Sequence, residues 1–199
     1  MSGTEVRDQL LQAALRVYAV SGVRGATTRR IAHEAGVNEV TLFRHFGSKD
    51  TLLQEALAWE SRQVIEGVGL PAEPVDPPQE LLEFCRRQHR VLLASGPLIR
   101  TSMAEFGEHP EATRLVCQAP VRLAEELQQY LVRLRTKGLA AGDWQPRAAA
   151  AMLMGTLFSD AMGRECMPER FPPEQDAIAQ YVELFLRAIG SAGSVPRSR

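Results

Sequence analysis

Apolar residues recur at helical spacing along most of the chain, and Pro and Gly divide it into helix-length blocks. In residues 4–21, positions such as Leu10, Ala14 and Val17 fall on one side of a 3.6-residue helix, and Gly22 ends the block. Later blocks, each with Pro at or near its first helical position, cover residues 78–94, 97–106, 110–137, 146–166 and 173–189. Strand-like alternation is not apparent. We therefore predict an all-α chain of about nine helices.

Two short helices are predicted after the first block. Thr27 or Thr28 is a suitable N-cap for the first of them, which runs to Ala35. Gly36 permits the left-handed turn that follows, and Asn38 is an N-cap for the second helix, residues 39–46. The order of helix, Gly turn and helix predicts a compact pair.

The rest of the chain is divided by Ser, Pro and Gly. Ser48 is expected to begin a longer helix, 48–66, which ends at the Pro- and Gly-rich connection 67–79. Pro120 should kink or split its helical block. The tail, residues 191–199, is predicted to be disordered.

The two short helices have the layout of a helix-turn-helix. Ala32 is small where the helices would cross, and Ile31, Val37 and Leu42 supply apolar contacts. In such a motif, the second helix enters the major groove of DNA with its N-terminal half toward the base edges. We therefore expect DNA binding by this segment.

The polar residues of the motif fit this chemistry. Thr28, Thr41, His45 and Lys49 can donate hydrogen bonds to phosphates, whereas Arg29 and Arg44 can reach a guanine edge or a phosphate; all six lie between residues 28 and 49. Glu39 is unusual beside phosphates. It could accept from a cytosine amino group, or it could simply complement the positive end of the helix.

Charge is concentrated in the same segment. Residues 24–49 hold five Lys or Arg against two Glu, a net +3, so the remainder sums to −4 in a chain whose total is −1. This distribution favours a small basic module attached to a mildly acidic body.

The segments "LLQAALRVYAVSGVRGATTRRIAHEAGV" and "TLFRHFGSKDTLLQEAL" resemble the DNA-binding domain of TetR-family bacterial regulators. The resemblance covers a little over a quarter of the chain, residues 4–57. It implies a DNA-binding domain in residues 1–47 and a ligand-binding and dimerisation domain in residues 48–190, with helix 48–66 bridging both.

The resemblance also implies which residues contact DNA. Phosphate contacts are expected from Thr27, Thr28, His45 and Lys49, and base or mixed contacts from Arg29, Asn38, Glu39, Val40, Thr41 and Arg44. Phe43 departs from the family, which usually has Tyr there. Phe43 keeps the ring but lacks the hydroxyl, and so loses a phosphate hydrogen bond of roughly 0.5–1.5 kcal/mol net.

A ridge of small residues predicts a helix–helix interface in the larger domain. Ala151, Gly155, Ser159 and Gly163 recur at every fourth position, and the last helix carries an apolar stripe. The resemblance implies a four-helix interface between two subunits, and hence a palindromic operator. Alternatively, both stripes pack inside one monomer. The predicted interface residues are Ala151, Gly155, Ser159, Met162, Gly163, Ile178, Tyr181, Val182 and Phe185.

Soft and aromatic residues with a few polar groups suggest a site for a small, largely apolar organic effector. Most of them could equally belong to an ordinary core. The candidates are Trp59, Gln63, Phe84, Gln88, His89, Met103, Phe106, Cys117, Met154 and Phe158.

Cys85 and His89 share a helix face at i and i+4, which suits two metal ligands, although Zn²⁺ requires four. A metal or thiol sensor is therefore an alternative to a buried Cys and a hydrogen-bonded His. No cofactor is predicted. The sequence contains no HExxH, P-loop, GxSxG or paired ExxH motif, so enzymatic activity is not expected.

These patterns predict a homodimeric, ligand-responsive transcriptional regulator, a repressor that is released from DNA by its effector. A regulator of the same fold without a small-molecule effector remains the main alternative. Three widely spaced Cys, no signal-peptide pattern and no apolar run long enough for a membrane span indicate a cytoplasmic protein.

Overall fold

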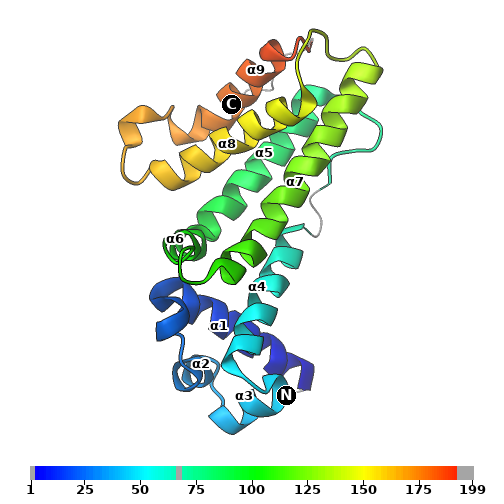
Figure 1. Cartoon of the computed structure of the whole chain (residues 1–199). Helices are drawn as coiled ribbons and strands as arrows, with labels where there is room; N and C mark the ends of the chain where they lie inside the picture. The colour runs from blue at the N-terminus through cyan, green and yellow to red at the C-terminus, as the bar shows by residue number, and fades with distance from the viewer. Residues whose placement is uncertain (1–2, 66–68, 192–199) are drawn as a thin grey trace. The chain divides into compact units, whose positions relative to one another are not determined.

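A computed structural model of the protein describes residues 3–65 and 69–191. Within these residues the secondary structure is helical throughout, which confirms the all-α prediction (Figure 1). The helices are α1 (Gly3–Gly25), α2 (Thr28–Glu34), α3 (Glu39–Phe46), α4 (Lys49–Ile65), α5 (Pro77–Ala94), α6 (Gly96–Ala104), α7 (Pro110–Thr136), α8 (Pro146–Gly163) and α9 (Glu174–Ala188), with a 3₁₀ turn η1 (Pro168–Arg170).

The chain forms two compact units, each made from two stretches of sequence. Of the described residues, unit 1 contains 3–65 and 95–119, and unit 2 contains 69–94 and 120–191. Unit 1 therefore combines α1–α4 with α6 and the start of α7. This grouping by contacts differs from the predicted functional division after residue 47, which stays a prediction.

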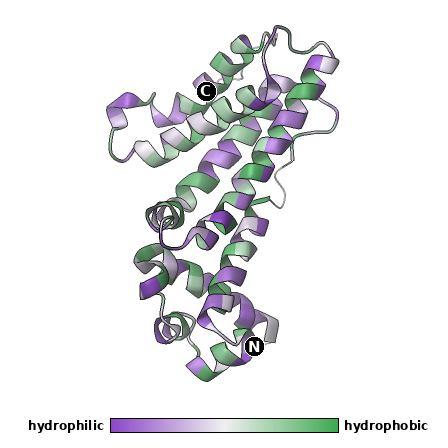
Figure 2. Cartoon of the chain, in the orientation of Figure 1, coloured by the Kyte–Doolittle hydropathy of each residue, from purple (hydrophilic) through white to green (hydrophobic). Residues whose placement is uncertain are grey.

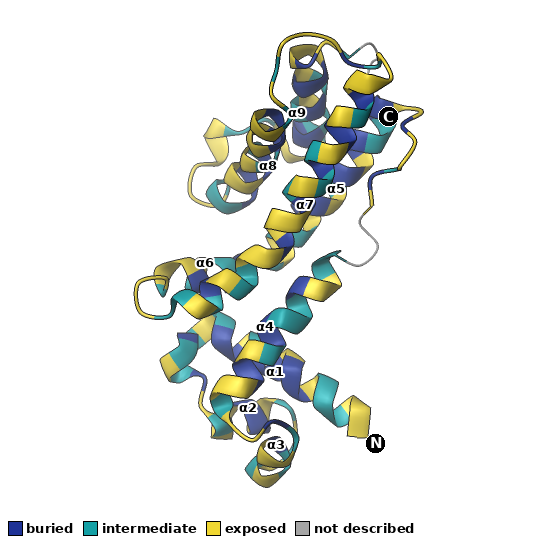
Figure 3. Cartoon of the chain, turned by 45° about the vertical axis from the view of Figure 1, so that its right-hand side comes forward, coloured by how far each residue is buried: buried dark blue, intermediate teal, exposed yellow. Residues whose placement is uncertain are grey.

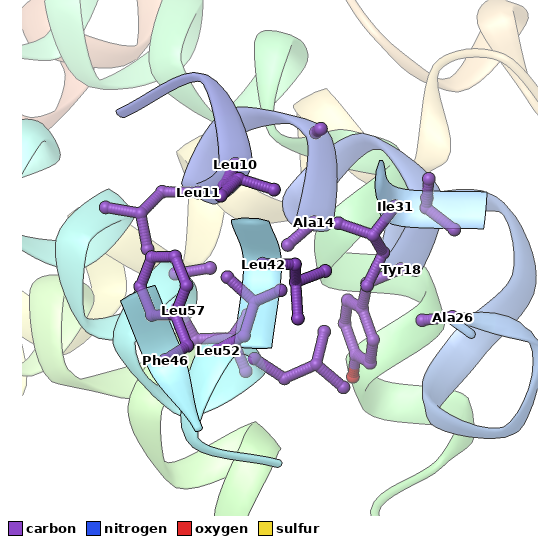
Figure 4. Close-up of a cluster of buried hydrophobic side chains, with 14 of the residues drawn as sticks. Leu10, Leu11, Ala14, Tyr18, Ala26, Ile31, Leu42, Phe46, Leu52 and Leu57 are labelled. Carbon is purple, nitrogen blue, oxygen red and sulfur yellow. The ribbon is translucent and has the colours of Figure 1, made fainter. Parts of the chain in front are cut away.

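Unit 1 is held together by apolar side chains from α1 to α4 and from α6. Figure 4 shows part of this cluster. Leu10 and Leu11 of α1, Ile31 of α2 and Leu42 of α3 are all fully buried in this cluster. Leu98 of α6 joins the same cluster although it lies far along the chain. Because burying a Leu or Ile side chain contributes about 1.5–3 kcal/mol, this core fixes the short helices that could not persist alone.

Helix α1 is interrupted near its end. Gly22 has φ 64° and ψ −174°, a non-helical conformation that side chains rarely tolerate, and helical geometry resumes immediately afterwards. The predicted helix end at Gly22 is thus a break within α1, and one more turn continues to Gly25 before α2 begins.

In unit 2, α5 packs against α8 and α9. Its core includes Leu81 of α5, Leu127 of α7 and Leu157 of α8, all fully buried. Near the start of α5, the Tyr130 hydroxyl donates to the Glu80 carboxylate at 2.5 Å. Burial is the main cause that raises the pKa of Tyr130, and the bond to this carboxylate is the second.

The helix boundaries differ from the predictions by a few residues. Helix α5 begins at Pro77, and α8 stops at Gly163, before the short 3₁₀ turn. Helix α7 continues through Pro120 and is not split. Of the tail predicted to be disordered, residues 191–199, all but Ser191 lie outside the described part of the chain. Among the described residues, none of the helices has the length and apolar character required for a membrane span.

Candidate nucleic-acid interface

Side-chain caps fix the two short helices of the motif. The Thr27 Oγ1 accepts a hydrogen bond from the Arg30 amide at 3.3 Å, and the Asn38 Oδ1 accepts from the Thr41 amide at 2.9 Å. Between them, Gly36 has φ 68° and makes the left-handed turn. The predicted caps and turn are therefore confirmed.

Helix α3 has one buried and one open face. Leu42 and Phe46 anchor it in the core of unit 1. On the other side, Val40 is 74 % exposed and Phe43 is 46 % exposed, and Arg44 is exposed beside them. Figure 3 shows the exposed residues of α3 in yellow. Two apolar groups and a guanidinium on one short, open helix form a surface that can contact thymine methyl groups and guanine edges.

The predicted phosphate-binding residues occupy the surroundings of α3. Thr27 is exposed and Thr28 is half-buried at the start of α2. His45 is half-buried, with its ring centroid 6.2 Å from that of Phe46. Lys49 begins α4, where its Nζ donates to the Val23 carbonyl at 2.9 Å. An ammonium has three donors, so this bond leaves two for phosphate.

Glu39 has a partner within the motif. The Thr28 Oγ1 lies 3.4 Å from the Glu39 Oε1, at the long limit of a hydrogen bond, and joins the first residue of α2 to the first residue of α3. This contact is a third role besides the two that the sequence suggested. The remaining predicted contacts, Arg29 and Thr41, lie at the same end of the unit, with Arg29 exposed and Thr41 half-buried.

Two family models match the chain. Residues 10–56 match "Bacterial regulatory proteins, tetR family", and residues 79–190 match "AefR-like transcriptional repressor, C-terminal domain". The chain belongs to the TetR family. It is a transcriptional regulator with a helix-turn-helix DNA-binding domain, as the sequence predicted.

Similar proteins extend over most of this TetR-family chain. The transcriptional repressor KstR2 of Mycolicibacterium smegmatis is 41 % identical over 158 residues, covering 70 % of this chain and 68 % of KstR2. The regulator YvkB of Bacillus subtilis is 24 % identical over 185 residues, covering 92 % of this chain and 96 % of YvkB. A solved TetR-family regulator from Mesorhizobium loti has a TM-score of 0.74 and 27 % identity, covering 96 % of this chain and 99 % of that one.

The predicted effector residues are divided between the two units. Unit 1 contains Trp59, Gln63, Met103, Phe106 and Cys117, of which all but the half-buried Trp59 are exposed. Unit 2 contains Phe84, Gln88, His89, Met154 and Phe158. Phe84, Gln88 and His89 are buried, and the Gln88 Nε2 has no hydrogen-bond partner among the described residues.

Sequence reasoning missed a buried polar cluster in unit 2. Asp160 of α8 is fully buried and accepts from His89 Nε2 at 2.8 Å, from Tyr181 Oη at 2.6 Å and from Arg164 Nε at 3.0 Å. Burial raises the pKa of Asp160, but the donors, led by Arg164, outweigh it, so that this pKa lies below its usual value. His89 thus serves as a partner of Asp160. Asp160 and Arg164 are an i, i+4 pair that local spacing could have identified, whereas His89 and Tyr181 lie too far along the chain for any local pattern to predict the contact.

The predicted interface residues on α8 are open. Ala151, Gly155 and Ser159 are exposed, and a Cβ placed on Gly155 would meet no atom within 4 Å. Figure 2 shows the apolar and small residues of α8 in green and pale shades along its length. Gly163 is an exception, because a Cβ there would lie 3.0 Å from the Phe171 ring. Its small size is explained by packing within the chain.

The predicted stripe on α9 needs correction. Val182 is fully buried, Phe185 is 3 % exposed and Ile178 is 7 % exposed, all within one chain. These side chains have almost no surface left to bury against a partner, so we remove them from the predicted interface. Tyr181 is half-buried and is engaged with Asp160, and Met162 is half-buried on α8. Helical periodicity identified the buried face of α9 but not what buries it.

The surroundings of Cys85 and His89 do not favour the alternative of a metal sensor. Cys85 is fully buried, and burial raises the pKa of its thiol, which disfavours the thiolate that binds metals. His89 directs Nε2 to Asp160. Among residues 3–65 and 69–191, three or more His, Cys, Asp or Glu side chains nowhere come together as a metal site requires.

Proposed function

We propose that this TetR-family protein is a cytoplasmic, non-enzymatic repressor that binds a palindromic operator as a homodimer and is released by a small, largely apolar organic effector. In this proposal residues 1–47 read DNA, and residues 48–190 carry the effector and dimer sites. The observation that carries the proposal is the open face of α3, where Val40, Phe43 and Arg44 stand out from an anchored helix.

The roles proposed within the motif are those that the resemblance implies. Thr27, Thr28, His45 and Lys49 contact phosphates. Base or mixed contacts come from Arg29, Asn38, Glu39, Thr41 and Arg44. Val40 contributes apolar contact to thymine methyl groups. Because α3 is fixed by Leu42 and Phe46, these groups approach DNA as one rigid surface.

The composition and exposure of α8 support dimerisation. The helix has apolar or small residues on all sides, yet Met152 is 52 % exposed and Phe158 is 36 % exposed. A helix that is apolar all round is normally buried. A second copy would cover this face, with Ala151, Gly155 and Ser159 allowing close approach of its backbone.

The buried amide of Gln88 supports an effector site in unit 2. Leaving a buried donor unpaired costs about 1–3 kcal/mol, so an effector with a carbonyl or hydroxyl oxygen would recover that cost by accepting from Gln88 Nε2. Phe84 and Met154, from α5 and α8 of the same unit, are the candidates for its apolar contacts.

Selection of binders from a random duplex pool tests the DNA-binding part of the proposal. We expect the wild-type protein to recover a two-fold symmetric site, with half-sites about one helical turn apart. Arg44→Ala and Thr41→Val should relax the preference at particular base pairs without abolishing binding. Failure of the wild type to enrich any sequence would contradict the proposal.

A thermal-shift screen of organic compounds tests the effector. A ligand that binds the folded state should raise Tm with concentration, following RT ln(1 + [L]/Kd), and should weaken DNA binding. Gln88→Leu should reduce that shift, while Gln129→Leu, an exposed site on α7, should not. If no compound acts and DNA binding is unaffected, a regulator of the same fold without a small-molecule effector is the better description.

A further inference from the structure

The break in α1 leaves a backbone amide that a distant helix satisfies. Because Gly22 is non-helical, the Val23 N–H lies directly after a break in the regular i→i−4 bonding of the helix. The Glu105 carboxylate, at the end of α6, accepts this N–H at 3.1 Å through Oε1 and 3.2 Å through Oε2. A Cβ on Gly22 would lie 1.9 Å from the Glu105 Oε1, so the glycine makes room for the carboxylate.

The carbonyl group of Val23 is also hydrogen-bonded by a side chain. The Val23 carbonyl accepts from Lys49 Nζ at 2.9 Å, and Lys49 is the first residue of α4. Two residues later, the Gly25 carbonyl accepts from Arg30 Nη1 of α2 at 2.9 Å. We call residues 22–27 the α1–α2 junction. Side chains from α2, α4 and α6 thus meet on its backbone.

The junction leads directly to the DNA-reading helix. It ends at Thr27, which caps α2, and the next residue, Thr28, contacts Glu39 at the start of α3. A shift of the junction therefore moves the beginning of α2 and, through it, the beginning of α3. The predicted phosphate contacts at Thr27 and Thr28 would move with it.

Glu105 does not act alone on α6. Leu98, Thr101 and Glu105 form one stripe of this helix, at positions i, i+3 and i+7. Leu98 is buried in the core of unit 1, and Thr101 Oγ1 donates to the Ala19 carbonyl of α1 at 2.7 Å. Burial is the main cause that raises the pKa of Tyr18 to about 12, and the negative charge of Glu105 is the second cause. Helix α6 is consequently fixed to the end of α1.

From this geometry we infer that Glu105 is a positioning residue for DNA recognition, which sets the α1–α2 junction, and hence α2 and α3, through the Val23 amide. The inference rests on the proposed function, since it assumes that α3 reads DNA.

Charge and reach at position 105 can be separated by three variants. Glu105→Asp keeps the charge but is one methylene shorter, Glu105→Gln keeps the reach and an acceptor oxygen, and Glu105→Ala removes both. Glu108→Ala is the matched control: Glu108 is an exposed carboxylate on the same turn, 3.1 Å from Arg24, with no bond to the junction backbone. It removes the same charge near the DNA-reading end.

Binding of full-length protein to the duplex selected by the wild type is measured by fluorescence anisotropy. We expect the Kd to rise at least tenfold for Glu105→Ala and Glu105→Asp, and less than threefold for Glu105→Gln and Glu108→Ala. Wild-type-like binding by a folded Glu105→Asp, or equal losses for Glu105→Ala and Glu108→Ala, would overturn the inference. If the wild type itself binds no duplex, the proposed function fails as well.

Hydrogen exchange of the Val23 amide gives a readout that does not depend on DNA. Exchange should accelerate at least tenfold in Glu105→Asp and remain unchanged in Glu108→Ala. If Glu105→Ala does not fold, the Asp and Gln variants still decide the question. Unchanged exchange at Val23 in a folded Glu105→Asp would show that the carboxylate does not hold the junction.

Discussion

The fully buried carboxylate of Asp160 on α8 lies 2.8 Å from the His89 Nε2 on α5. The two residues are 71 positions apart in sequence, and their contact joins the two helices. Arg164 and Tyr181 complete the hydrogen bonding of the same carboxylate. A buried charge in unit 2 is therefore compensated by three donors, and the loss of any one of them should be measurable.

Removing the carboxylate should destabilise the protein strongly. Breaking a buried ion pair leaves its partner uncompensated and typically costs about 3–5 kcal/mol, so we expect Asp160→Ala to lower the free energy of unfolding by about that amount. Urea unfolding followed by circular dichroism measures it. Asp143→Ala, at an exposed position of the same unit, should change the stability by less than about 0.5 kcal/mol.

The same carboxylate should give the stability a defined dependence on acid. The folded pKa of Asp160 is below its ordinary value of 3.8, so its contribution is present above that value and is lost as pH falls through the folded pKa. Wild-type stability should therefore decline below about pH 4. Asp160→Asn should flatten this decline in urea midpoints measured from pH 6 to 2.5, and an unaltered decline would contradict the assignment.

Restoring a hydroxyl at position 43 should strengthen DNA binding. Phe43 is 46 % exposed on α3, and Phe43→Tyr adds a donor for phosphate without changing the ring. A net hydrogen bond of roughly 0.5–1.5 kcal/mol corresponds to about 2- to 10-fold tighter binding. Because phosphates carry no sequence information, anisotropy titrations should show the gain on selected and scrambled duplexes alike. A gain confined to one sequence would indicate a base contact.

The salt dependence of binding tests the predicted phosphate contact of Lys49. Lys49→Ala should weaken binding to every duplex and reduce the slope of log K against log salt by about 0.9, the value for one released counterion. Lys137→Ala removes the chain's other lysine, in unit 2, and should leave the slope unchanged. If Lys49→Ala binds more weakly but keeps the wild-type slope, Lys49 does not contact a phosphate, and its role is the hydrogen bond to the Val23 carbonyl.

The open face of α8 predicts the effect of a large side chain at its centre. A Cβ on Gly155 meets nothing within 4 Å in the single chain, so Gly155→Leu should fold normally but dissociate the proposed dimer. Sedimentation or a sizing column measures this. Gln129→Leu adds the same side chain at an exposed position of α7 and should leave the dimer intact. A dimer that survives Gly155→Leu would exclude this face as the interface.

Local chemistry explains which parts of the fold were predictable. Each N-cap side chain accepts a hydrogen bond from the backbone amide three residues later, at Thr27, Asn38 and Ser48. Gly36 makes its turn through its own left-handed backbone conformation. Such features need only neighbouring sequence, so the caps, the turn and the all-α class followed from pattern. The end of α8 was predicted less accurately, because it lies where Gly163 packs against Phe171, just before η1.

Contacts between distant segments were not predictable in this way. Glu105 reaches Val23 across 82 positions, and Asp160 meets His89 across 71. Periodicity showed that α9 has an apolar face, but the same stripe suits a dimer seam and an internal core. The burial of Val182 decided between them. For the DNA-reading residues, the sequence identified candidates whose exposure is now known and whose contacts stay predictions.

That α6 belongs to unit 1 bears on how this protein can be dissected. A fragment that stops at residue 65 would lack Leu98, and it would uncover the apolar side of α1 that Leu98 covers. Such a fragment should aggregate or melt at low temperature. Hybrids that exchange operator preference with a relative should transfer residues 95–119 together with the N-terminal segment, since the two stretches pack into one compact unit.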